Sequence, residues 1–268
     1  MAHPSWQPEP ATAETPSILS KAFDLLRAFN PHARVMTLSE LSRASGLPKS
    51  TVHRLLARLV ELGAVEHHRS GYKIGLGLLQ LGASTPAGYM RDLAMPHLAK
   101  LHRWCGLTVH FGVLRQYDVV YLEKMSTADS PSSIAQVGSR LPANCTALGK
   151  ALLAHEDLDD LADFLPSPLP MMTVRSVTSV GTLISELRKV RDGGIAREHE
   201  EAQLGLACVA APLLMNGFAI GALSLGHPSD VDPPAKVENA LKATAAQIVS
   251  EVQVGLAQGR DHWFPRET

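Results

Sequence analysis

The sequence predicts an α+β protein of two domains, the first of them a winged helix-turn-helix. Three observations predict this fold class. Residues 37–63 contain a short capped helix, a glycine turn and a second, amphipathic helix. Residues 64–74 have the pattern of a short hairpin, and from residue 107 onwards strand patterns mix with helices. The length of 268 residues, 45% of them hydrophobic, suffices to bury two cores.

The N-terminal stretch predicts a tail and then a helix. Residues 1–15 are proline-containing and have no apolar period, which predicts a disordered tail. Residues 17–29 carry apolar side chains at helical spacing and stop before Asn30 and Pro31. This helix has more apolar positions than one core face needs. We expect the excess to extend the core, with a dimer contact as the alternative.

The next segment predicts the first helix of the helix-turn-helix. Thr37 with Glu40 three residues later is a capping box, and Gly46 suits the left-handed conformation that ends a helix. Pro48 fits the first turn of a new helix. Two helices joined by a short glycine-containing turn are therefore expected.

The second helix, from Pro48 to Gly63, has two contrasting faces. Its apolar face carries Val52, Leu55, Leu56, Leu59 and Leu62, and its polar face carries Ser50, Arg54, Ala57 and Arg58. A helix in a DNA major groove needs guanidinium and hydroxyl groups that reach base edges, and small residues that allow close approach. An ordinary solvated face is the alternative for this helix alone, but the helix before it favours DNA recognition.

A wing is predicted directly after this helix. Val65 and residues 72–74 suit short strands, and residues 69–71 have the chemistry of a turn. His67 and His68 suggest donors near phosphate. A metal site is not expected there, because neighbours in a strand point to opposite faces.

Beyond the wing, the pattern predicts a linker helix and a mixed domain. Helices are predicted over residues 75–84, 86–104, 146–155, 157–164, 182–191 and 233–258. Strands are predicted over residues 107–115, 119–125, 132–138, 206–215 and 218–227. Asn216 and Gly217 separate the last two strands and are the strongest hairpin signal in the chain.

The charge distribution favours nucleic acid as the partner of the first domain. The whole chain has a formal net charge of -1, but residues 20–73 carry nine Lys or Arg and only four Asp or Glu side chains. A basic module on an acidic body is typical of a regulated DNA-binding protein.

Cysteine usage and hydropathy indicate an intracellular protein. The three cysteines, Cys105, Cys145 and Cys208, are odd in number and widely spaced, so neither a disulfide framework nor a metal knuckle is expected. No apolar run approaches the length of a membrane span. We therefore expect a cytoplasmic protein without membrane partners, metal or cofactor.

Eight segments together resemble one known family. They are SILSKAFDLLRAF, TLSELSRASGLPKSTVHRLLARLVELGAVE, YKIGLGLLQLG, LTVHFGVL, VVYLEKM, LPANCTALGKALLA, EEAQLGLACVAAPL and IGALSLGHP, which span about residues 17–256. In this order they are similar to the isocitrate lyase regulator (IclR) family of bacterial transcription factors. The resemblance implies a winged helix-turn-helix (residues 16–75), a linker helix (76–86), a GAF-like effector-binding and oligomerisation domain (87–258) and a tail (259–268). It also implies a homodimer or a dimer of dimers.

The resemblance further implies a ligand-responsive regulator of catabolic genes, for which repression is favoured over activation. The effector is expected to be a small carboxylic or aromatic acid. Carried over from the family motifs, the effector-binding residues are Ala143, Asn144, Cys145, Thr146 and Ala147 from one segment, and Glu198, Leu206, Cys208 and Ser224 from two others.

Two of these residues have readable chemistry. Thr146 precedes a helix, where free backbone donors and a hydroxyl suit a ligand carboxylate, although a plain helix cap is the alternative. Glu198 would repel such a ligand. It is expected to bind a ligand hydroxyl, to pair with a base such as Arg197, or to lie in solvent.

Three other readings of the second domain remain open. Cys145 or Cys208 acting as a nucleophile, with His110, His155 or His199 as base, would make it a small-molecule enzyme fused to a DNA-binding module. His97, His102 and His110 as metal ligands match no standard spacing. A scaffold without a ligand is disfavoured, because the domain is longer than dimerisation requires.

We expect the DNA contacts to concentrate at the start of the second helix and on the wing. Lys49, Thr51, Arg58 and Arg69 are expected on phosphates, Ser50 and Arg54 on base edges, His53 on the flank, and Lys73 on the wing. The expected target is a pseudo-palindromic operator in double-stranded DNA, bound by two such units.

Overall fold

A computed structural model describes residues 17–30, 33–128, 130 and 133–258. The chain divides into two compact units, one up to Ala83 and the other from Ser84. The tails predicted for residues 1–15 and 259–268 lie outside the described residues.

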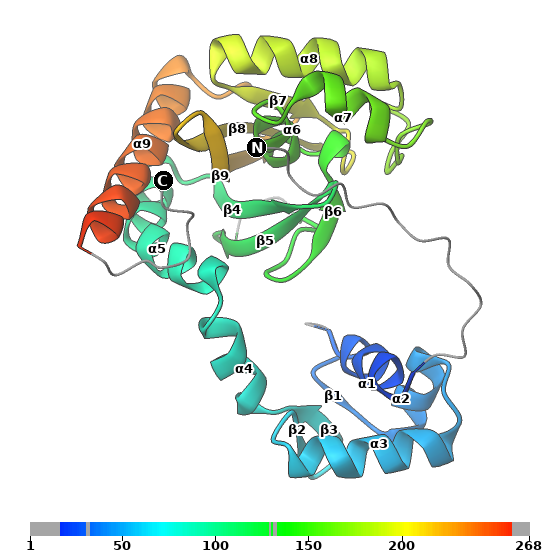
Figure 1. The fold of residues 1–268 in the computed structure, drawn as a ribbon. Coiled ribbons are helices and arrows are strands. Elements are labelled where there is room, and N and C mark those ends of the chain that lie inside the picture. Colours follow the sequence, from blue (N-terminus) through cyan, green and yellow to red (C-terminus); the bar gives the residue numbers. More distant parts are fainter. Residues whose placement is uncertain (1–16, 31–32, 129, 131–132, 259–268) are drawn as a thin grey trace. The chain divides into compact units, whose positions relative to one another are not determined.

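Up to residue 75, the described part of the first unit contains three helices and a small sheet (Figure 1). The helices are α1 (Ile18–Arg27), α2 (Leu38–Ser45) and α3 (Lys49–Glu61), and the strands are β1 (Val35–Met36), β2 (Val65–His68) and β3 (Gly71–Ile74). Thr37 and Glu40 form the predicted capping box, and Gly46 ends α2 with φ of 68°. The predicted helix-turn-helix and wing are thus confirmed as secondary structure.

The wing has a third strand that the sequence pattern did not predict. The two residues of β1 pair antiparallel with β3, so that the strand order is β1-β3-β2. Gly71 allows this pairing, since a Cβ there would lie 2.3 Å from the Met36 carbonyl oxygen. Its φ of 151° also favours glycine.

The expectations for two apolar surfaces of this unit are wrong. In α1 only Leu25 is fully buried, while Ile18, Leu19 and Phe23 are exposed, so the excess apolar residues do not extend the core. Leu62 is exposed as well, because α3 ends at Glu61 and Gly63 turns the chain with φ of 69°. The next helix, α4 (Leu76–Ala83), has no buried residue.

The second unit is built on a six-stranded antiparallel sheet. Its strands are β4 (Thr108–Arg115), β5 (Asp118–Met125), β6 (Arg140–Pro142), β7 (Ala196–His199), β8 (Leu206–Met215) and β9 (Phe218–Pro228). The strand order is β6-β5-β4-β9-β8-β7, so the two predicted hairpins join through β4 and β9. The Asn216-Gly217 turn connects β8 and β9 as predicted.

Helices pack on both faces of this sheet (Figure 1). On one face lie α5 (Pro86–Cys105) and α9 (Ala235–Ala257). On the other lie α6 (Ala147–Leu153), α7 (Leu158–Phe164) and α8 (Val180–Gly193), with the 3-10 turn η1 (Ala143–Cys145) before α6. None of the helices in the described part of the chain is long and apolar enough to cross a membrane.

The strand predicted over residues 132–138 is wrong for its described part, residues 133–138. Local side chains compete there for the backbone: Ser139 Oγ accepts from Gln136 N at 3.0 Å, and Ser133 Oγ accepts from Ala135 N at 3.2 Å. Gly138 then turns the chain with φ of 84°. The third strand of the hairpin sheet is β6 instead, immediately after this turn.

Candidate functional site

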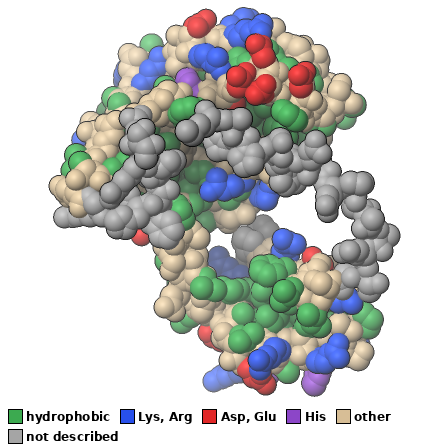
Figure 2. Space-filling model, viewed as in Figure 1, with side chains coloured by type: hydrophobic (Ala, Val, Ile, Leu, Met, Phe, Trp, Pro, Cys, Tyr) green, Lys and Arg blue, Asp and Glu red, His purple; other side chains and the backbone are tan. Residues whose placement is uncertain are grey.

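The outer face of α3 is exposed and basic. Val52, Leu55, Leu56 and Leu59 turn inward and are buried, which leaves the other side of the helix to solvent. The exposed side carries Lys49, Ser50, His53, Arg54, Ala57 and Arg58, with Thr51 half-buried. Figure 2 shows Lys, Arg and His side chains along the part of the unit that α3 forms. Pro48 gives the helix no side-chain cap, so backbone donors stay open at its start.

Acidic partners engage two of the predicted DNA-binding cations. Arg58 pairs with Glu61 at 2.6 Å, and Lys73 pairs with Glu66 at 3.0 Å. Within the described residues, no ion pair is recorded for Lys49, Arg54 or Arg69. The cations at the start of α3 and at the tip of the wing are therefore the most available for phosphates or base edges.

A hydrogen bond connects the wing to the helix that follows it. Glu66 Oε1 accepts a hydrogen bond from Leu76 N, at the start of α4, at 3.0 Å. His68 Nδ1 lies 2.9 Å from Ser70 Oγ, and the His67 ring tilts against Tyr72. Across the described residues, no group of three His, Cys, Asp or Glu side chains has the arrangement of a metal site.

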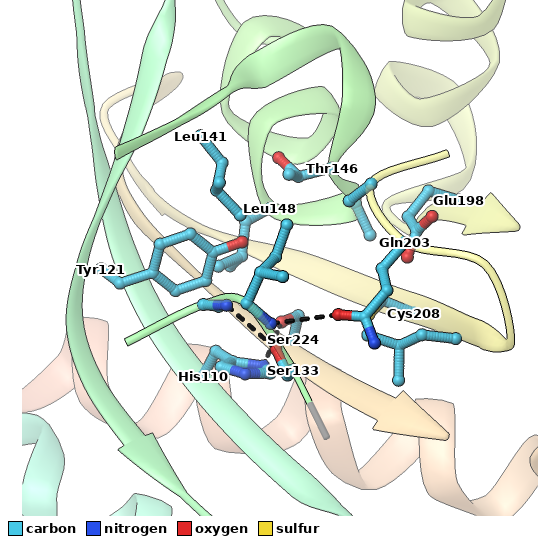
Figure 3. A pocket seen from close by; sticks show the side chains of 15 residues that line it. His110, Tyr121, Ser133, Leu141, Thr146, Leu148, Glu198, Gln203, Cys208 and Ser224 are labelled. Carbon is cyan, nitrogen blue, oxygen red and sulfur yellow. Dashed lines mark hydrogen bonds between the residues drawn. The ribbon is translucent and has the colours of Figure 1, made fainter. Parts of the chain in front are cut away.

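The second unit contains a small cavity between α6, the sheet and two loops (Figure 3). Tyr121 and His110 lie on one side of it, and Glu198 and Gln203 on the other (Figure 3). The space open to the centre of a water molecule is about 20 Å³, enough for one water and too little for an organic acid. Ile134 N donates to Gln203 Oε1 at 3.1 Å and so joins the two loops. The walls must therefore move before an organic ligand enters.

Six of the nine residues that the family motifs suggested line this cavity. They are Thr146, Ala147, Glu198, Leu206, Cys208 and Ser224. Ala143, Asn144 and Cys145 are not among the lining residues. Asn144 is instead directed at a loop, where its Nδ2 donates to the Pro170 and Val177 carbonyls at 2.8 and 2.9 Å.

His110 and Tyr121 line the cavity and were missed as ligand contacts. His110 lies beside Ser224, with 3.4 Å between Nδ1 and Oγ, and its Nε2 is buried without a hydrogen-bond partner in the described structure. Burial, with the nearby Lys124 charge, lowers the pKa of His110 to about 3, so its ring is neutral. The only sequence signal was the presence of polar side chains in two apolar strands, because nothing in the pattern paired β4 with β9.

Thr146 is a helix cap whose side chain faces the cavity. Its Oγ1 accepts a hydrogen bond from Gly149 N at 3.0 Å, and every residue of α6 after it is buried. Gly149 permits this turn to approach η1, since a Cβ there would meet the Ala143 carbonyl oxygen at 2.2 Å. Thr146 thus caps α6, as the alternative predicted.

Glu198 is buried and has no basic partner among the described residues. It is 4% exposed, and its Oε2 accepts from Glu201 N at 3.0 Å. Burial raises the pKa of Glu198 to about 7, although hydrogen bonds from the Cys208 side chain and the Glu201 backbone oppose this. Two of the predicted alternatives are wrong, because the residue is not solvated and Arg197 pairs with Glu238 at 2.5 Å instead.

A buried lysine contacts Glu201, whose backbone N donates to Glu198. Lys150 on α6 is 1% exposed, and its Nζ bonds Glu186 Oε2 at 2.8 Å and Glu201 Oε1 at 2.6 Å. One cation thus serves two carboxylates, and Glu201 Oε2 remains buried without a recorded partner. Burial raises the pKa of Glu201 despite the lysine beside it.

The structure gives no support to a cysteine nucleophile. Burial raises the pKa of Cys145 and of Cys208, so both remain thiols rather than reactive thiolates. Cys145 Sγ contacts the Pro170 carbonyl oxygen, and Cys208 shares its hydrogen bond with Glu198. Neither cysteine has a recorded hydrogen bond to a histidine in the described residues.

Comparison with known proteins matches both units. The family model for the bacterial transcriptional regulator IclR C-terminal domain matches residues 88–250, and that for the IclR helix-turn-helix domain matches residues 18–69. The HTH-type transcriptional regulator KdgR of Escherichia coli (strain K12) is 32% identical over 80% of this chain and 82% of its own length. XynR of the same strain, another HTH-type transcriptional regulator, is 30% identical over 92% and 97%.

A solved structure of a ligand complex has the same architecture. The crystal structure of an IclR homolog from Microbacterium hydrocarbonoxydans complexed with 4-hydroxybenzoate matches with a TM-score of 0.80 and 26% identity. The match covers 89% of this chain and 100% of that chain.

Proposed function

Since the chain belongs to the IclR family, and is therefore a ligand-responsive DNA-binding transcriptional regulator rather than an enzyme, we propose that α3 reads an operator beside catabolic genes. Arg54 and Ser50 contact base edges, while Lys49, Thr51, Arg58 and Arg69 contact phosphates. His53 and Lys73 lie on the flanks of this interface. The observation that carries the proposal is the exposed basic face of α3, directly opposite its fully buried face.

Base reading is concentrated in the first two turns of α3. Arg54 has no recorded acidic partner in the described residues, whereas Arg58 already pairs with Glu61 further along the helix. A carboxylate at that end is repelled by phosphate. The guanidinium of Arg54 has the fork geometry that binds guanine O6 and N7.

The chain binds a pseudo-palindromic operator as a homodimer or as a dimer of dimers, with two copies on the two half-sites. The exposed apolar side chains of the first unit support self-association: Ile18, Leu19 and Phe23 on α1, and Leu76, Leu79 and Leu81 on α4. Figure 2 shows the apolar patch over α1. Exposed apolar residues in such number mark an interaction surface. Two-fold symmetry of the protein then matches two half-sites on the DNA.

A small organic acid enters the cavity of the second unit and changes DNA binding, with repression as the mode of action. The support is the set of polar groups that converge there, together with the homologue that binds 4-hydroxybenzoate. Thr146 offers a hydroxyl at the start of α6 for the ligand carboxylate. Because its proposed partners are DNA and a metabolite, the protein acts in the cytoplasm.

Replacing Arg54 tests the DNA interface. A duplex selected from a random library with the full-length protein serves as the specific site, and a scrambled duplex of equal length as the non-specific one. Arg54→Ala should weaken specific binding by about 1–3 kcal/mol in fluorescence anisotropy and affect the scrambled duplex less. Equal losses on both duplexes would remove Arg54 from base reading.

Two further variants calibrate that experiment. Lys49→Ala should weaken both duplexes alike and lower the slope of affinity against salt by about one. Arg188→Ala removes an exposed arginine of α8, in the other unit, and should change neither affinity.

Replacing Thr146 tests the ligand cavity. Calorimetry with small carboxylic and aromatic acids should detect a ligand whose affinity Thr146→Val lowers and Thr146→Ser preserves, because serine keeps the capping hydroxyl. Thr182→Val, at an exposed position of α8, is the matched control. Unaltered affinity in Thr146→Val would exclude Thr146 from the site.

A further inference from the structure

The ligand cavity offers an anion no positive charge. Glu198 is the only Asp, Glu, Lys or Arg among its described lining residues. His110 is neutral, and the remaining polar lining groups are Tyr121, Ser133, Thr146, Gln203, Cys208 and Ser224. An acid that enters as a carboxylate therefore meets hydrogen-bonding groups and one carboxyl group of its own kind.

Two lysines close to the cavity are already engaged. Lys150 on α6 is shared between Glu186 of α8 and Glu201 of the loop after β7. Lys124 on β5 donates to the Ser133 and Ala135 carbonyls at 3.3 and 2.9 Å, and does not line the cavity. With two carboxylates on Lys150, this cation is not left over for Glu198, and Glu201 opposes the ionisation of Glu198.

The remaining titratable groups around Glu198 do not take part near neutral pH. Cys208 on β8 shares a hydrogen bond with it, and burial raises the pKa of that thiol well above its usual range. Burial likewise raises the pKa of Tyr121 on β5, and His110 on β4 stays neutral down to strongly acidic pH. Glu198 is thus the one lining group that changes charge around neutrality.

We propose that the cavity binds its acid effector together with one proton, which Glu198 carries in the complex. The inference rests on the proposed function, in which this cavity binds a small organic acid. As a neutral carboxyl group, Glu198 no longer repels a ligand carboxylate and can donate a hydrogen bond to it, while its other oxygen still accepts from Glu201 N. A buried pair of two ionised carboxylates without a cation would be strongly unfavourable.

The same chemistry defines the class of ligand. A compound with a single carboxylate needs one proton from solution, whereas a second carboxylate in the cavity would find no titratable partner. We therefore expect monocarboxylates to bind better than dicarboxylates of similar size. Uncharged amides of the same acids should bind without proton uptake, because they do not oppose the ionised form of Glu198.

Proton uptake is measured by calorimetry on the full-length protein. Benzoate, 4-hydroxybenzoate and propanoate are titrated at pH 6.5, 7.5 and 8.5, each in two buffers with different heats of ionisation, alongside benzamide, 4-hydroxybenzamide and propanamide. The affinity of a binding acid should fall about tenfold per pH unit above neutrality, with nearly one proton taken up at pH 8.5. The corresponding amide should show neither effect.

A pair of variants assigns the proton to Glu198. Glu198→Gln mimics the protonated side chain, so it should bind the acid with an affinity that does not vary between pH 6.5 and 8.5. Glu156→Gln removes another glutamate whose pKa burial raises, but which lies outside the cavity, and it should keep the pH dependence of the wild type.

The outcomes separate this inference from the proposed function. If none of the acids binds at any pH, the proposed ligand site fails and the inference with it. If an acid binds without proton uptake, or if Glu198→Gln keeps the slope, only the inference is overturned. The buffer comparison on the wild type decides the matter even if Glu198→Gln does not fold.

Discussion

Glu198 shows how one buried carboxyl group connects function with stability. Its folded-state pKa of about 7 lies above the ordinary value of 4.5, so between these values the folded protein holds more protons than the unfolded chain. The free energy of unfolding therefore falls as the pH rises from about 4.5 to 7, and it stays lower above that range. This is the energetic cost of keeping an acid in a cavity that has no cation.

Replacing this acid should stabilise the protein selectively at high pH. Without the penalty of a buried charge, Glu198→Gln should raise the stability of the second unit at pH 8 by on the order of 2 kcal/mol, and by little at pH 5. Thermal unfolding of both proteins at the two pH values measures the difference. A stabilisation that does not depend on pH would contradict the assignment.

Asn144 should stabilise the loop at residues 170–177 through its hydrogen bonds. Asn144→Ala removes the hydrogen bonds from Asn144 to the Pro170 and Val177 carbonyls, so it should lower the free energy of unfolding by about 1–3 kcal/mol. Asn144→Asp should do at least as much harm, because a carboxylate repels both carbonyl oxygens. Denaturant titration measures both changes, and an unchanged midpoint would mean that these hydrogen bonds contribute nothing.

Individual residues were predictable where the signal was local. The spacing along residues 48–63 predicted which side chains of α3 turn inward, except Leu62 at its end. His110 and Tyr121 carry no such signal, because they meet Ser224 and Glu198 only after β4 pairs with β9 and α6 covers the sheet.

At the scale of elements, short-range interactions made the helix-turn-helix predictable from the sequence. The capping box at Thr37, the left-handed Gly46 and the Asn216-Gly217 turn each act within a few residues, and each is found where predicted. The strand expected over residues 132–138 failed because serine and glutamine side chains bind the backbone there. The sequence pattern could not reveal strand β1, since two residues are too few to show an alternation.

Helix α6 depends on one close contact. Gly149→Ala would place a Cβ against the Ala143 carbonyl, which is backbone and cannot yield, so it should destabilise the second unit by about 3 kcal/mol or prevent folding. Gly181→Ala on α8 is the matched control, because its Cβ would meet only Ser179 Oγ at 4.0 Å. Since alanine favours helix, Gly181→Ala should be neutral or stabilising in thermal unfolding. Equal effects of the two variants would refute the role of this contact.

At the scale of the molecule, the order of motifs predicted a DNA-binding unit and a mixed unit, and the structure divides the chain between Ala83 and Ser84. What the pattern could not predict was which apolar faces stay unpaired. Helix α4 is as rich in leucine as a core helix, yet none of its leucines is buried in the single chain.

Self-association should depend on these leucines. Leu79→Glu places a charge at the 69% exposed position of α4 and should shift the protein toward monomer in analytical ultracentrifugation, with weaker binding to the selected operator. Val231→Glu adds the same charge at an exposed apolar position of the second unit and should leave both properties unchanged. A Leu79→Glu protein that associates like the wild type would exclude α4 from the interface.

The proposed regulator couples DNA reading by α3 to the binding of an acid in the cavity of the second unit. The most direct measurement is the dissociation constant of the acid with and without saturating operator, paired with that of the operator with and without saturating acid. Because coupling is reciprocal, we expect both constants to change by the same factor, about 5- to 150-fold. If neither constant changes while both ligands bind, the cavity and the DNA interface are uncoupled and the account is contradicted.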